Sequence, residues 1–437
     1  MESSIALIIV LVVFALSLFG GMNISSVLIL SGMVGIYLIV GIDPVINLVQ
    51  VDTFSTAASY TLTTIPLFVL MSQFIVKSDI VKYLYSLIFI TSRGKSAILG
   101  VFTVILGGFL GAVSGSASAM SAALGQFAVP ELKKHGYGET FAASIAAAAG
   151  SLATIIPPSI GLIVYGAITQ TSISSLFIGI IIPGIITIVL LSLIVVFIYY
   201  KESKKNPTQN TEHGETKRYS TRNYVISAAT GILIMVAILG GIYSGIFTPT
   251  EAGGVGAFIT LIAALILGKV NKEFIASSFK ETIKITTMVM MIMIGATIFT
   301  RFVTLSRLPQ KLIETLGPLL DSPMLIMIIL LAIFFVAFMF LEGAAAIVML
   351  VPITLPLAES VGYSPLEFGI IMSVIGTAGL ITPPVGISTY AVSGVTRISS
   401  NKIFRYTMVY AIFISIFGSA ILLLFPELIT WLPNSMK

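Results

Sequence analysis

The sequence contains no cysteine, only two histidines and one tryptophan, and only 9% of its 437 residues are charged. The lack of cysteine excludes disulfide bonds and thiolate metal sites but leaves the redox compartment open. The scarcity of charge excludes an ordinary soluble domain, in which about 25% of the residues are charged. Hydrophobic residues instead make up 57% of the chain, and apolar stretches of the roughly 20 residues that cross a bilayer recur from end to end. The composition therefore predicts an all-α membrane protein.

The second half of the chain repeats the first at a spacing of 226 residues. The matching positions are Val129-Pro130 and Leu355-Pro356, Gly136-Tyr137 and Gly362-Tyr363, Gly150 and Gly376, Pro157-Pro158 and Pro383-Pro384, and, after a one-residue deletion, Gly161 and Gly386, and Tyr165 and Tyr390. The repeated part is a proline-broken hydrophobic segment. Segments interrupted by Gly and Pro at matching places in two halves indicate a transporter whose binding site lies near the middle of the membrane.

Ten membrane spans are predicted, five in each half. They cover residues 5–19, 24–42, 63–76, 140–169, 173–200, 224–243, 252–268, 285–302, 367–395 and 403–425. Two further apolar segments, 97–129 and 324–357, contain small-residue breaks at 114–118 and 342–346. Basic residues flank both ends of the first segment and acidic residues flank both ends of the second. Because basic loops stay in the cytoplasm, both segments are predicted to be re-entrant hairpins, of opposite orientation.

This topology places 19 of the 23 Lys and Arg residues on the cytoplasmic side and both termini on the outer side. The polar stretch 201–223, with six basic and three acidic residues, is predicted to be a cytoplasmic linker between two inverted halves. Both histidines fall in cytoplasmic loops. Since no histidine or aspartate is expected inside the membrane, a proton relay would depend on Glu342 almost alone, which favours coupling to sodium.

The first hairpin turns within a run of small residues between Gly111 and Ala119. A turn inside the membrane leaves carbonyl groups at the end of one helix and N–H groups at the start of the next. Carbonyl ends suit a hard cation and N–H ends suit an anion, and serine hydroxyls add oxygen ligands. Ser114, Ser116 and Ser118 are therefore candidate ligands.

Paired prolines break two of the crossing helices. Proline removes a hydrogen-bond donor and clashes with the preceding turn, so the carbonyl groups before Pro157 lose their partners. Ser159 is then placed near the start of the next half-helix. The counterpart in the second half is Thr382-Pro383-Pro384-Val385-Gly386. Two such breaks, each paired with a hairpin, favour a cation and substrate site over a simple kink.

Two ionisable residues lie in apolar surroundings, where a charge is a functional hypothesis by default. Glu342 opens the second hairpin turn, and three roles remain open for it: holding a cation, binding a proton, or capping the following helix. Arg301 is placed either to give a substrate carboxylate two parallel hydrogen bonds or to extend to the outer interface. Glu251 follows a Thr-Pro turn and is predicted to be a structural acid at a helix start.

Four motifs resemble, in order and over nearly the whole chain, the large membrane subunit of TRAP (tripartite ATP-independent periplasmic) transporters. They are GAVSGS at 111–116, IPPS at 156–159, FTPTEA at 247–252 and LITPPVG at 380–386. The resemblance implies an elevator-type ion-transporter fold with two inverted repeats, in which a transport domain moves against a scaffold. It also implies a sodium-driven importer of small organic acids in the bacterial inner membrane. Its implied partners are a small four-helix membrane subunit and a periplasmic substrate-binding protein, with no nucleic acid.

The resemblance further assigns domains and site residues. Scaffold helices are expected at 1–95, 173–200 and 224–308, transport-domain segments at 96–172 and 309–402, and a C-terminal helix at 403–437. Two or more sodium ions, and no organic cofactor, are expected near Ser114, Ser116, Gly150, Thr154, Pro157, Glu342, Gly343, Thr377, Thr382 and Pro384. The substrate is expected near Ser116, Ser118, Ser159, Arg301, Gly386 and Ser388.

The chain departs from the family pattern at both hairpin turns. Many members carry an acid just beyond the first hairpin's serines, where this chain has Ser118-Ala119-Met120-Ser121. Many also have an Asp-Pro-Thr-like second turn, where it has Glu342-Gly343-Ala344. The hydroxyl-rich first site and Arg301 favour a polar sugar acid such as sialic acid, with a C4-dicarboxylate next.

Two other classes of function are weighed against this one. A sodium/carboxylate carrier that needs no binding protein would share the hairpins and the inverted halves. An intramembrane enzyme is disfavoured, because no His, Cys or intramembrane Asp is expected to act as a catalytic partner for Glu342.

Overall fold

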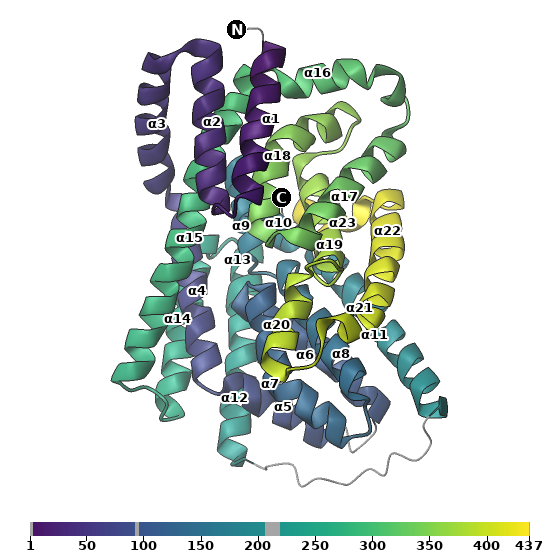
Figure 1. The fold of residues 1–437 in the computed structure, drawn as a ribbon. Coiled ribbons are helices and arrows are strands. Elements are labelled where there is room, and N and C mark those ends of the chain that lie inside the picture. Colours follow the sequence, from purple (N-terminus) through teal and green to yellow (C-terminus); the bar gives the residue numbers. More distant parts are fainter. Residues whose placement is uncertain (1–2, 92–95, 206–218, 437) are drawn as a thin grey trace.

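The computed structural model describes residues 3–91, 96–205 and 219–436, and within these ranges the chain consists of helices and short loops without a strand (Figure 1). Eight of the described helices are long and apolar enough to cross a membrane, and shorter apolar helices accompany them. The predicted all-α membrane class is confirmed.

The helices divide between two halves of similar order. The first half contains α1 (Ser3–Phe19), α2 (Ile24–Val40), α3 (Ile42–Ala57), α4 (Thr64–Lys77), α5 (Ile80–Thr91), α6 (Ser96–Ser114), α7 (Ala117–Lys134), α8 (Glu139–Ser151), α9 (Ile160–Thr169), α10 (Ile173–Gly179) and α11 (Ile181–Lys205). The second half contains α12 (Thr221–Met235), α13 (Gly241–Tyr243), α14 (Pro249–Ile266), α15 (Lys272–Leu305), α16 (Leu308–Thr315), α17 (Pro323–Phe340), α18 (Gly343–Ser360), α19 (Pro365–Gly379), α20 (Ile387–Thr396), α21 (Ser400–Phe413), α22 (Ser419–Leu424) and α23 (Glu427–Asn434).

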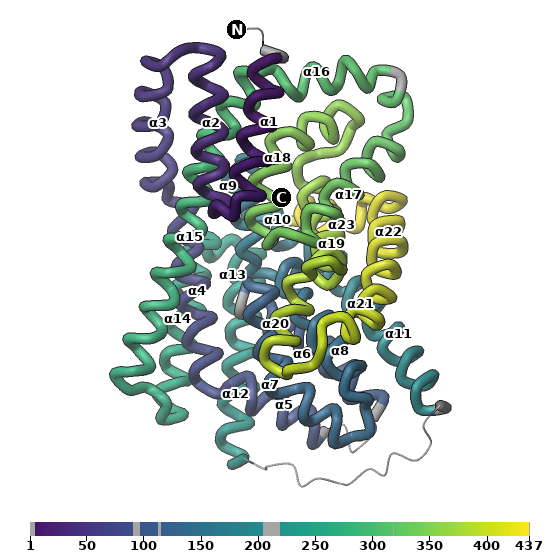
Figure 2. Tube along the Cα trace, viewed as in Figure 1, coloured from purple at the N-terminus to yellow at the C-terminus, as the bar shows by residue number. Residues whose placement is uncertain are grey.

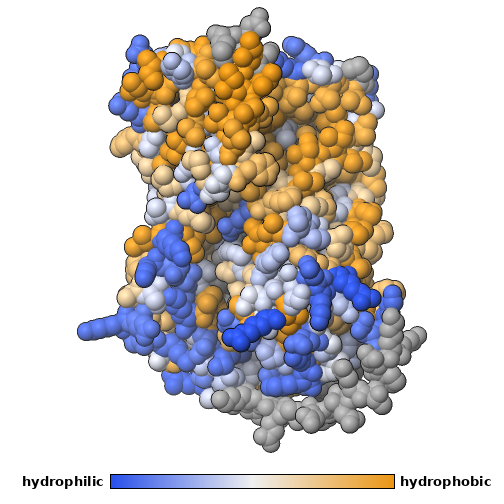
Figure 3. All heavy atoms as spheres, in the orientation of Figure 1, coloured by the Kyte–Doolittle hydropathy of each residue, from blue (hydrophilic) through white to orange (hydrophobic). Residues whose placement is uncertain are grey.

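Both re-entrant hairpins occur where the sequence predicts them. Gly115 and Ser116 separate α6 from α7, and Leu341 and Glu342 separate α17 from α18. The α6–α7 hairpin opens at the end of the molecule where α11 stops and α12 starts, whereas the α17–α18 hairpin opens at the opposite end, beside α16 (Figure 1). On the face drawn in Figure 3, hydrophilic side chains gather at the α11–α12 end and hydrophobic ones at the other. The hairpins therefore have the predicted opposite orientation.

The repeat extends to the backbone conformation. Residues in the left-handed region occur in matched pairs, at Gly41 and Gly268, Asp79 and Arg307, Gly136 and Gly362, and Gln170 and Arg397. Few residues other than glycine adopt a positive φ. A positive φ recurs at matched positions even where the two halves carry different side chains, as at Asp79 and Arg307. The two halves therefore have the same backbone conformation at these positions.

The longest structural elements are two equivalent arms. Arm 2 is α15, whose 34 residues extend about 50 Å. Arm 1 is the segment 42–77, formed by α3, a short 3-10 turn at Tyr60–Thr63 and α4. Arm 2 packs along α2, α3 and α4, while α14 packs on α4 and α1 on α2 (Figure 2). These helices form the scaffold.

The predicted spans cover only part of each arm. The sequence predicts no helix between residues 42 and 63 and begins the later span at residue 285, but the structure contains α3 and starts α15 at Lys272. The outer faces of both segments carry exposed polar residues, including Asn47 and Gln50 on α3 and Lys280 on α15. Such side chains lower the mean hydropathy, so a search for continuous apolar runs misses these helices.

The hairpins and the broken helices pack together as a second unit, called here the hairpin domain (α6–α11 and α17–α22). α7 packs on α8 and α20, and α18 packs on α9. α11 packs on α6, and α21 packs on α8. Residues 173–200 and most of 403–437 thus pack against the hairpins, while the division into scaffold and transport domain stays a prediction.

Glu251 has the predicted structural role. Its carboxylate accepts hydrogen bonds from the backbone N–H of Thr248 at 2.8 Å and from the Thr248 hydroxyl at 2.9 Å, and its own N–H donates to Thr248 Oγ1 at 3.3 Å. This capping box starts α14.

A polar contact joins the two arms. Arg301 of α15 donates to Asp52 of α3 through Nε at 3.1 Å and Nη2 at 3.3 Å, and the hydroxyls of Thr56 and Thr297 are hydrogen-bonded at 3.1 Å. Asp52 is only 2% exposed. This buried aspartate is not expected from the sequence, because the pattern shows neither that α3 exists nor that a basic partner stands 249 residues away.

Replacing Arg301 with methionine is expected to lower the thermal stability of the protein in detergent. The buried Asp52 carboxylate would lose both donors, at a cost of about 1–3 kcal/mol in the free energy of unfolding. The double variant Asp52→Leu/Arg301→Met is expected to regain most of this loss, because no buried charge is left unpaired. Arg307→Met, at an exposed arginine without a salt bridge in the described structure, is the control; an equal loss there would contradict the interpretation.

Candidate functional site

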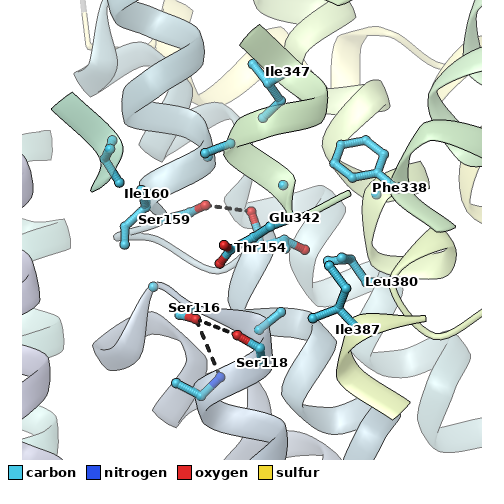
Figure 4. A pocket seen from close by; sticks show the side chains of 18 of the residues that line it. Ser116, Ser118, Thr154, Ser159, Ile160, Phe338, Glu342, Ile347, Leu380 and Ile387 are labelled. Carbon is cyan, nitrogen blue, oxygen red and sulfur yellow. Dashed lines mark hydrogen bonds between the residues drawn. The ribbon is translucent and has the colours of Figure 1, made fainter. Parts of the chain in front are cut away.

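The two hairpin tips face each other across a cavity of about 410 Å³. Its wall is formed by the α6–α7 tip, the start of α9, the α17–α18 tip and one face of arm 2. The polar side chains that line it are Ser116, Ser118, Thr154, Ser159, Glu342 and Ser373. Figure 4 shows the hydroxyls and the carboxylate pointing into a common space.

The first tip is closed by a glycine turn and a serine cap. Gly115 has φ +60°, and a Cβ there would lie 3.2 Å from Ile160 and 3.3 Å from the carbonyl oxygen of Pro158. Ser116 caps α7 by accepting from the N–H of Ala119 at 3.5 Å, and its hydroxyl lies 3.2 Å from that of Ser118 (Figure 4). The tip is therefore seated directly on the proline-broken helix.

The proline break leaves a row of carbonyl groups without donors. The Ser159 hydroxyl donates to the carbonyl oxygen of Thr154 at 2.7 Å and accepts from the N–H of Leu162 at 3.5 Å, which starts α9. No described residue donates a hydrogen bond to the carbonyl groups of residues 155–158. The break therefore offers oxygen ligands of the kind that a hard cation prefers.

The second tip is fixed to the second break. The N–H of Gly386, which has φ +53°, donates to the carbonyl oxygen of Met339 at 2.9 Å. The N–H of Ser388 donates to the carbonyl oxygen of Leu380 at 3.1 Å. The hydroxyls of Thr154 and Thr377 are 3.2 Å apart and join the two broken helices. Each tip thus rests on the broken helix of its own half.

Glu342 is the one ionisable side chain among the described residues that line the cavity. It stands at the start of α18, but its carboxylate makes no capping hydrogen bond. It points into the cavity beside Thr154 (Figure 4). Because α7, α9 and α18 all begin at the cavity wall, their positive ends also face this space. The site therefore combines one carboxylate with several weakly positive helix starts.

The predicted residues fall into three groups. Those that line the cavity are Ser116, Ser118, Thr154, Ser159, Glu342 and Gly343. Those that do not line it are Gly150, Pro157, Thr377, Thr382, Gly386 and Ser388, which are buried behind the wall, and Pro384 and Arg301, which are exposed. The side chain of Ser114 lies outside the described residues.

The residues behind the wall hold the packing that shapes it. A Cβ on Gly150 would lie 2.2 Å from Ser121 Oγ, so this glycine allows α8 to approach α7 closely. Thr382 donates to the carbonyl oxygen of Ala378 at 2.7 Å. Ser388 is fully buried, and its hydroxyl has no hydrogen-bond partner in the described structure.

Arg301 does not line the cavity, because its guanidinium is engaged with Asp52 in the scaffold. Sequence reasoning also missed the cavity residues Ser373 and Phe338 and the four side chains of arm 2. Phe338 packs against Gly376 and Gly379, where a Cβ would lie 3.0 Å and 2.5 Å from it. The spacing of Ile285, Met288, Val289 and Ile292 marks one helix face, but an apolar face gives no signal that distinguishes a cavity from lipid.

Comparison with known proteins identifies relatives along the whole chain. The family model described as "Tripartite ATP-independent periplasmic transporter, DctM component" matches residues 11–428. The chain is 34% identical over 394 residues to the C4-dicarboxylate TRAP transporter large permease protein DctM of Pseudomonas aeruginosa, covering 88% of this chain and 87% of that protein. It is 27% identical over 420 residues to the sialic acid TRAP transporter large permease protein SiaM of Vibrio cholerae, covering 95% and 96%.

A solved structure has a similar fold. The YdaH transporter of Alcanivorax borkumensis matches 90% of this chain and 89% of its own with a TM-score of 0.65, at 13% sequence identity. At this identity the likeness concerns the fold alone.

Gly115→Ala is expected to destabilise the first tip. An alanine at positive φ costs about 1–2 kcal/mol, and its methyl group would press on Ile160 and Pro158. Thermal stability in detergent measures the effect. Gly138→Ala is the control, since Gly138 has φ −57° and nothing within 4 Å of the added Cβ; equal losses in the two variants would refute the close seating of the tip.

Proposed function

The chain belongs to the DctM family of tripartite ATP-independent periplasmic transporters, and from this premise we propose that it imports a small organic acid driven by sodium ions. The cavity between the two hairpin tips carries this proposal. It lies between both tips, the start of α9 and arm 2, and it presents hydroxyls, helix starts and the Glu342 carboxylate to one space.

The substrate is proposed to be an organic acid held by the helix starts and the serine hydroxyls. The described lining contains no basic side chain, so a carboxylate would be bound by backbone N–H groups. Of the two features that favoured sialic acid, the hydroxyls line the cavity and Arg301 does not. A C4-dicarboxylate is the second candidate, and it is favoured by the 34% identity to a C4-dicarboxylate permease.

The oxygen ligands at the two breaks fit sodium. The carbonyl groups of residues 155–158 and 382–385 receive no hydrogen bond from the described residues, and the Ser388 hydroxyl is buried without a partner. No cluster of three or more His, Cys, Asp or Glu side chains occurs in the described part of the chain. A donor set of carbonyls and hydroxyls suits a hard monovalent cation, which would supply positive charge beside Glu342 and the substrate.

The assembly and the movement are proposed from the family. A small four-helix membrane subunit and a periplasmic substrate-binding protein would complete the transporter in the bacterial inner membrane, with both termini of this chain on the periplasmic side. The hairpin domain would move past the scaffold as an elevator. The alternative is a sodium/carboxylate carrier that needs no binding protein.

Uptake into proteoliposomes tests this proposal. Vesicles holding this chain and its small subunit would receive an inward sodium gradient, with labelled sialic acid or a labelled C4-dicarboxylate, and with or without the binding protein. Uptake is expected only when both sodium and the binding protein are present. Uptake with sodium but without the binding protein would favour the alternative carrier. Uptake that does not depend on the sodium gradient would refute coupling to sodium.

Ser116→Ala is expected to raise the sodium concentration needed for half-maximal uptake by about five- to tenfold, the effect of one lost polar contact. Ser364→Ala is the matched control. Ser364 also caps a helix, α19, but does not line the cavity. Ser364→Ala therefore loses a helix cap, at a cost of about 1 kcal/mol, as Ser116→Ala does. It is expected to leave the sodium concentration for half-maximal uptake unchanged. An unchanged sodium response in Ser116→Ala would remove its side chain from the cation site.

A further inference from the structure

The scaffold closes the cavity with one arm only. Four residues of arm 2 line it, and they are Ile285, Met288, Val289 and Ile292. They occupy one helix face and are all apolar. Arm 1 contributes no residue to the described lining. In this conformation the hairpin tips therefore face an apolar wall on one side of a scaffold that has two equivalent arms.

Arm 1 has an equivalent of this wall. The arms are bracketed by the matched left-handed residues Gly41 and Gly268 before them and Asp79 and Arg307 after them. These anchors set the spacing between equivalent positions at 227 to 228 residues. The wall on arm 2 therefore corresponds to residues 57–65 of arm 1.

Residues 57–65 are the break in arm 1, and they differ in chemistry from the wall on arm 2. α3 ends at Ala57, the 3-10 turn follows, and α4 starts at Thr64. The segment carries the hydroxyls of Ser59, Tyr60, Thr61, Thr63 and Thr64. Tyr60 is 66% exposed. The equivalent of an apolar helix face is thus a bent segment rich in hydroxyls.

A second cavity, of about 370 Å³, already lies at this break. It is lined by Ser59, Tyr60, Thr61 and Thr64, by the α9–α10 loop and by the start of α14. The hydroxyls of Thr64 and Thr250 are hydrogen-bonded at 2.6 Å and hold the break against α14. The break is therefore a formed surface with open space beside it, on the scaffold side of the hairpin domain.

The hairpin domain has matching surfaces for both arms. α18 packs on α9, and their equivalents α7 and α20 pack on each other in the same way. In the present conformation α18 and α9 contact arm 2. Since the halves are inverted copies, exchanging their roles gives the opposite-facing state, in which α7 would contact arm 1.

We propose that Tyr60, Thr61 and Thr64 form the scaffold wall of the substrate cavity in the opposite-facing state. This inference rests on the proposed function, because it needs the hairpin domain to move. Under this proposal, a different scaffold wall borders the substrate cavity in each of the two conformations. A polar substrate meets hydroxyls on arm 1 and only apolar side chains on arm 2, so it is held by additional hydrogen bonds in one state and is released more easily in the other.

Paired cysteines test this placement, and the chain contains no cysteine that would interfere. Ala344→Cys/Val289→Cys reports the present state, since both positions line the cavity. The equivalent positions in the first half are Ser118 and Thr61, so Ser118→Cys/Thr61→Cys reports the opposite state. Membranes would be treated with a short thiol cross-linker, and linked peptides would be quantified by mass spectrometry.

Both pairs are expected to form cross-links, each of which would show that its contact occurs in one of the two states. Thr61→Cys/Gln126→Cys is the register control, because Gln126 is exposed on α7 more than two turns from the tip. A cross-link from Ala344→Cys/Val289→Cys without one from Ser118→Cys/Thr61→Cys would overturn the inference. So would equal linking of Thr61→Cys to Gln126→Cys.

The parent protein separates failure of the inference from failure of the proposed function. Sodium-driven uptake by the cysteine-free parent, together with no link at Thr61, would overturn the wall assignment alone. If the parent shows no sodium-driven uptake, the proposed function is overturned instead, whichever cross-links form.

Discussion

The structure depends on one constraint, which is that non-helical backbone inside a membrane must find its hydrogen-bond partners within the protein. Four of the breaks in the helices, two at hairpin tips and two at proline pairs, are brought together around the cavity. The breaks partly satisfy one another: Gly386 donates to Met339 of the second tip, and Ser159 donates to Thr154 within its own break. The carbonyl groups of residues 155–158 and 382–385 receive no hydrogen bond from the described residues. The candidate cation site is thus the place where backbone carbonyl groups of the breaks receive no hydrogen bond from the described residues.

The same constraint explains what the sequence could predict. Glycine, proline and serine interrupt apolar runs only where the chain can tolerate it, so the turns at Gly115 and Glu342 and the break before Ser159 were located to within a few residues. Matched spacing then gave the inverted repeat. α3 and the start of α15 were missed because a helix with one polar face looks like a loop in a hydropathy profile.

Partners across long separations could not be predicted either. Arg301 is predicted either to bind a substrate carboxylate or to extend to the outer interface, but its hydrogen bonds go to Asp52, which lies on a helix that the pattern does not reveal. Likewise, the four arm 2 residues at the cavity have the spacing of any apolar helix face. Only the packing of α18 and α9 beside α15 shows which face of α15 lines the cavity. The fold follows from local interruptions, whereas the composition of the site follows from tertiary packing.

The charge at the site bears on coupling. Glu342 is surrounded by apolar and hydroxyl-bearing side chains, and the described lining offers no basic residue to offset it. With Glu342 ionised, an acid entering this cavity would add a second negative charge at low dielectric, where like charges repel more strongly than in water. Helix starts carry only about half a unit charge each. If the substrate is an acid, as proposed, cations must therefore accompany it for the loaded cavity to approach neutrality. Under the proposed function, a coupled cation would offset the charge of the acid in the cavity, and the carbonyl groups at the breaks are its candidate ligands.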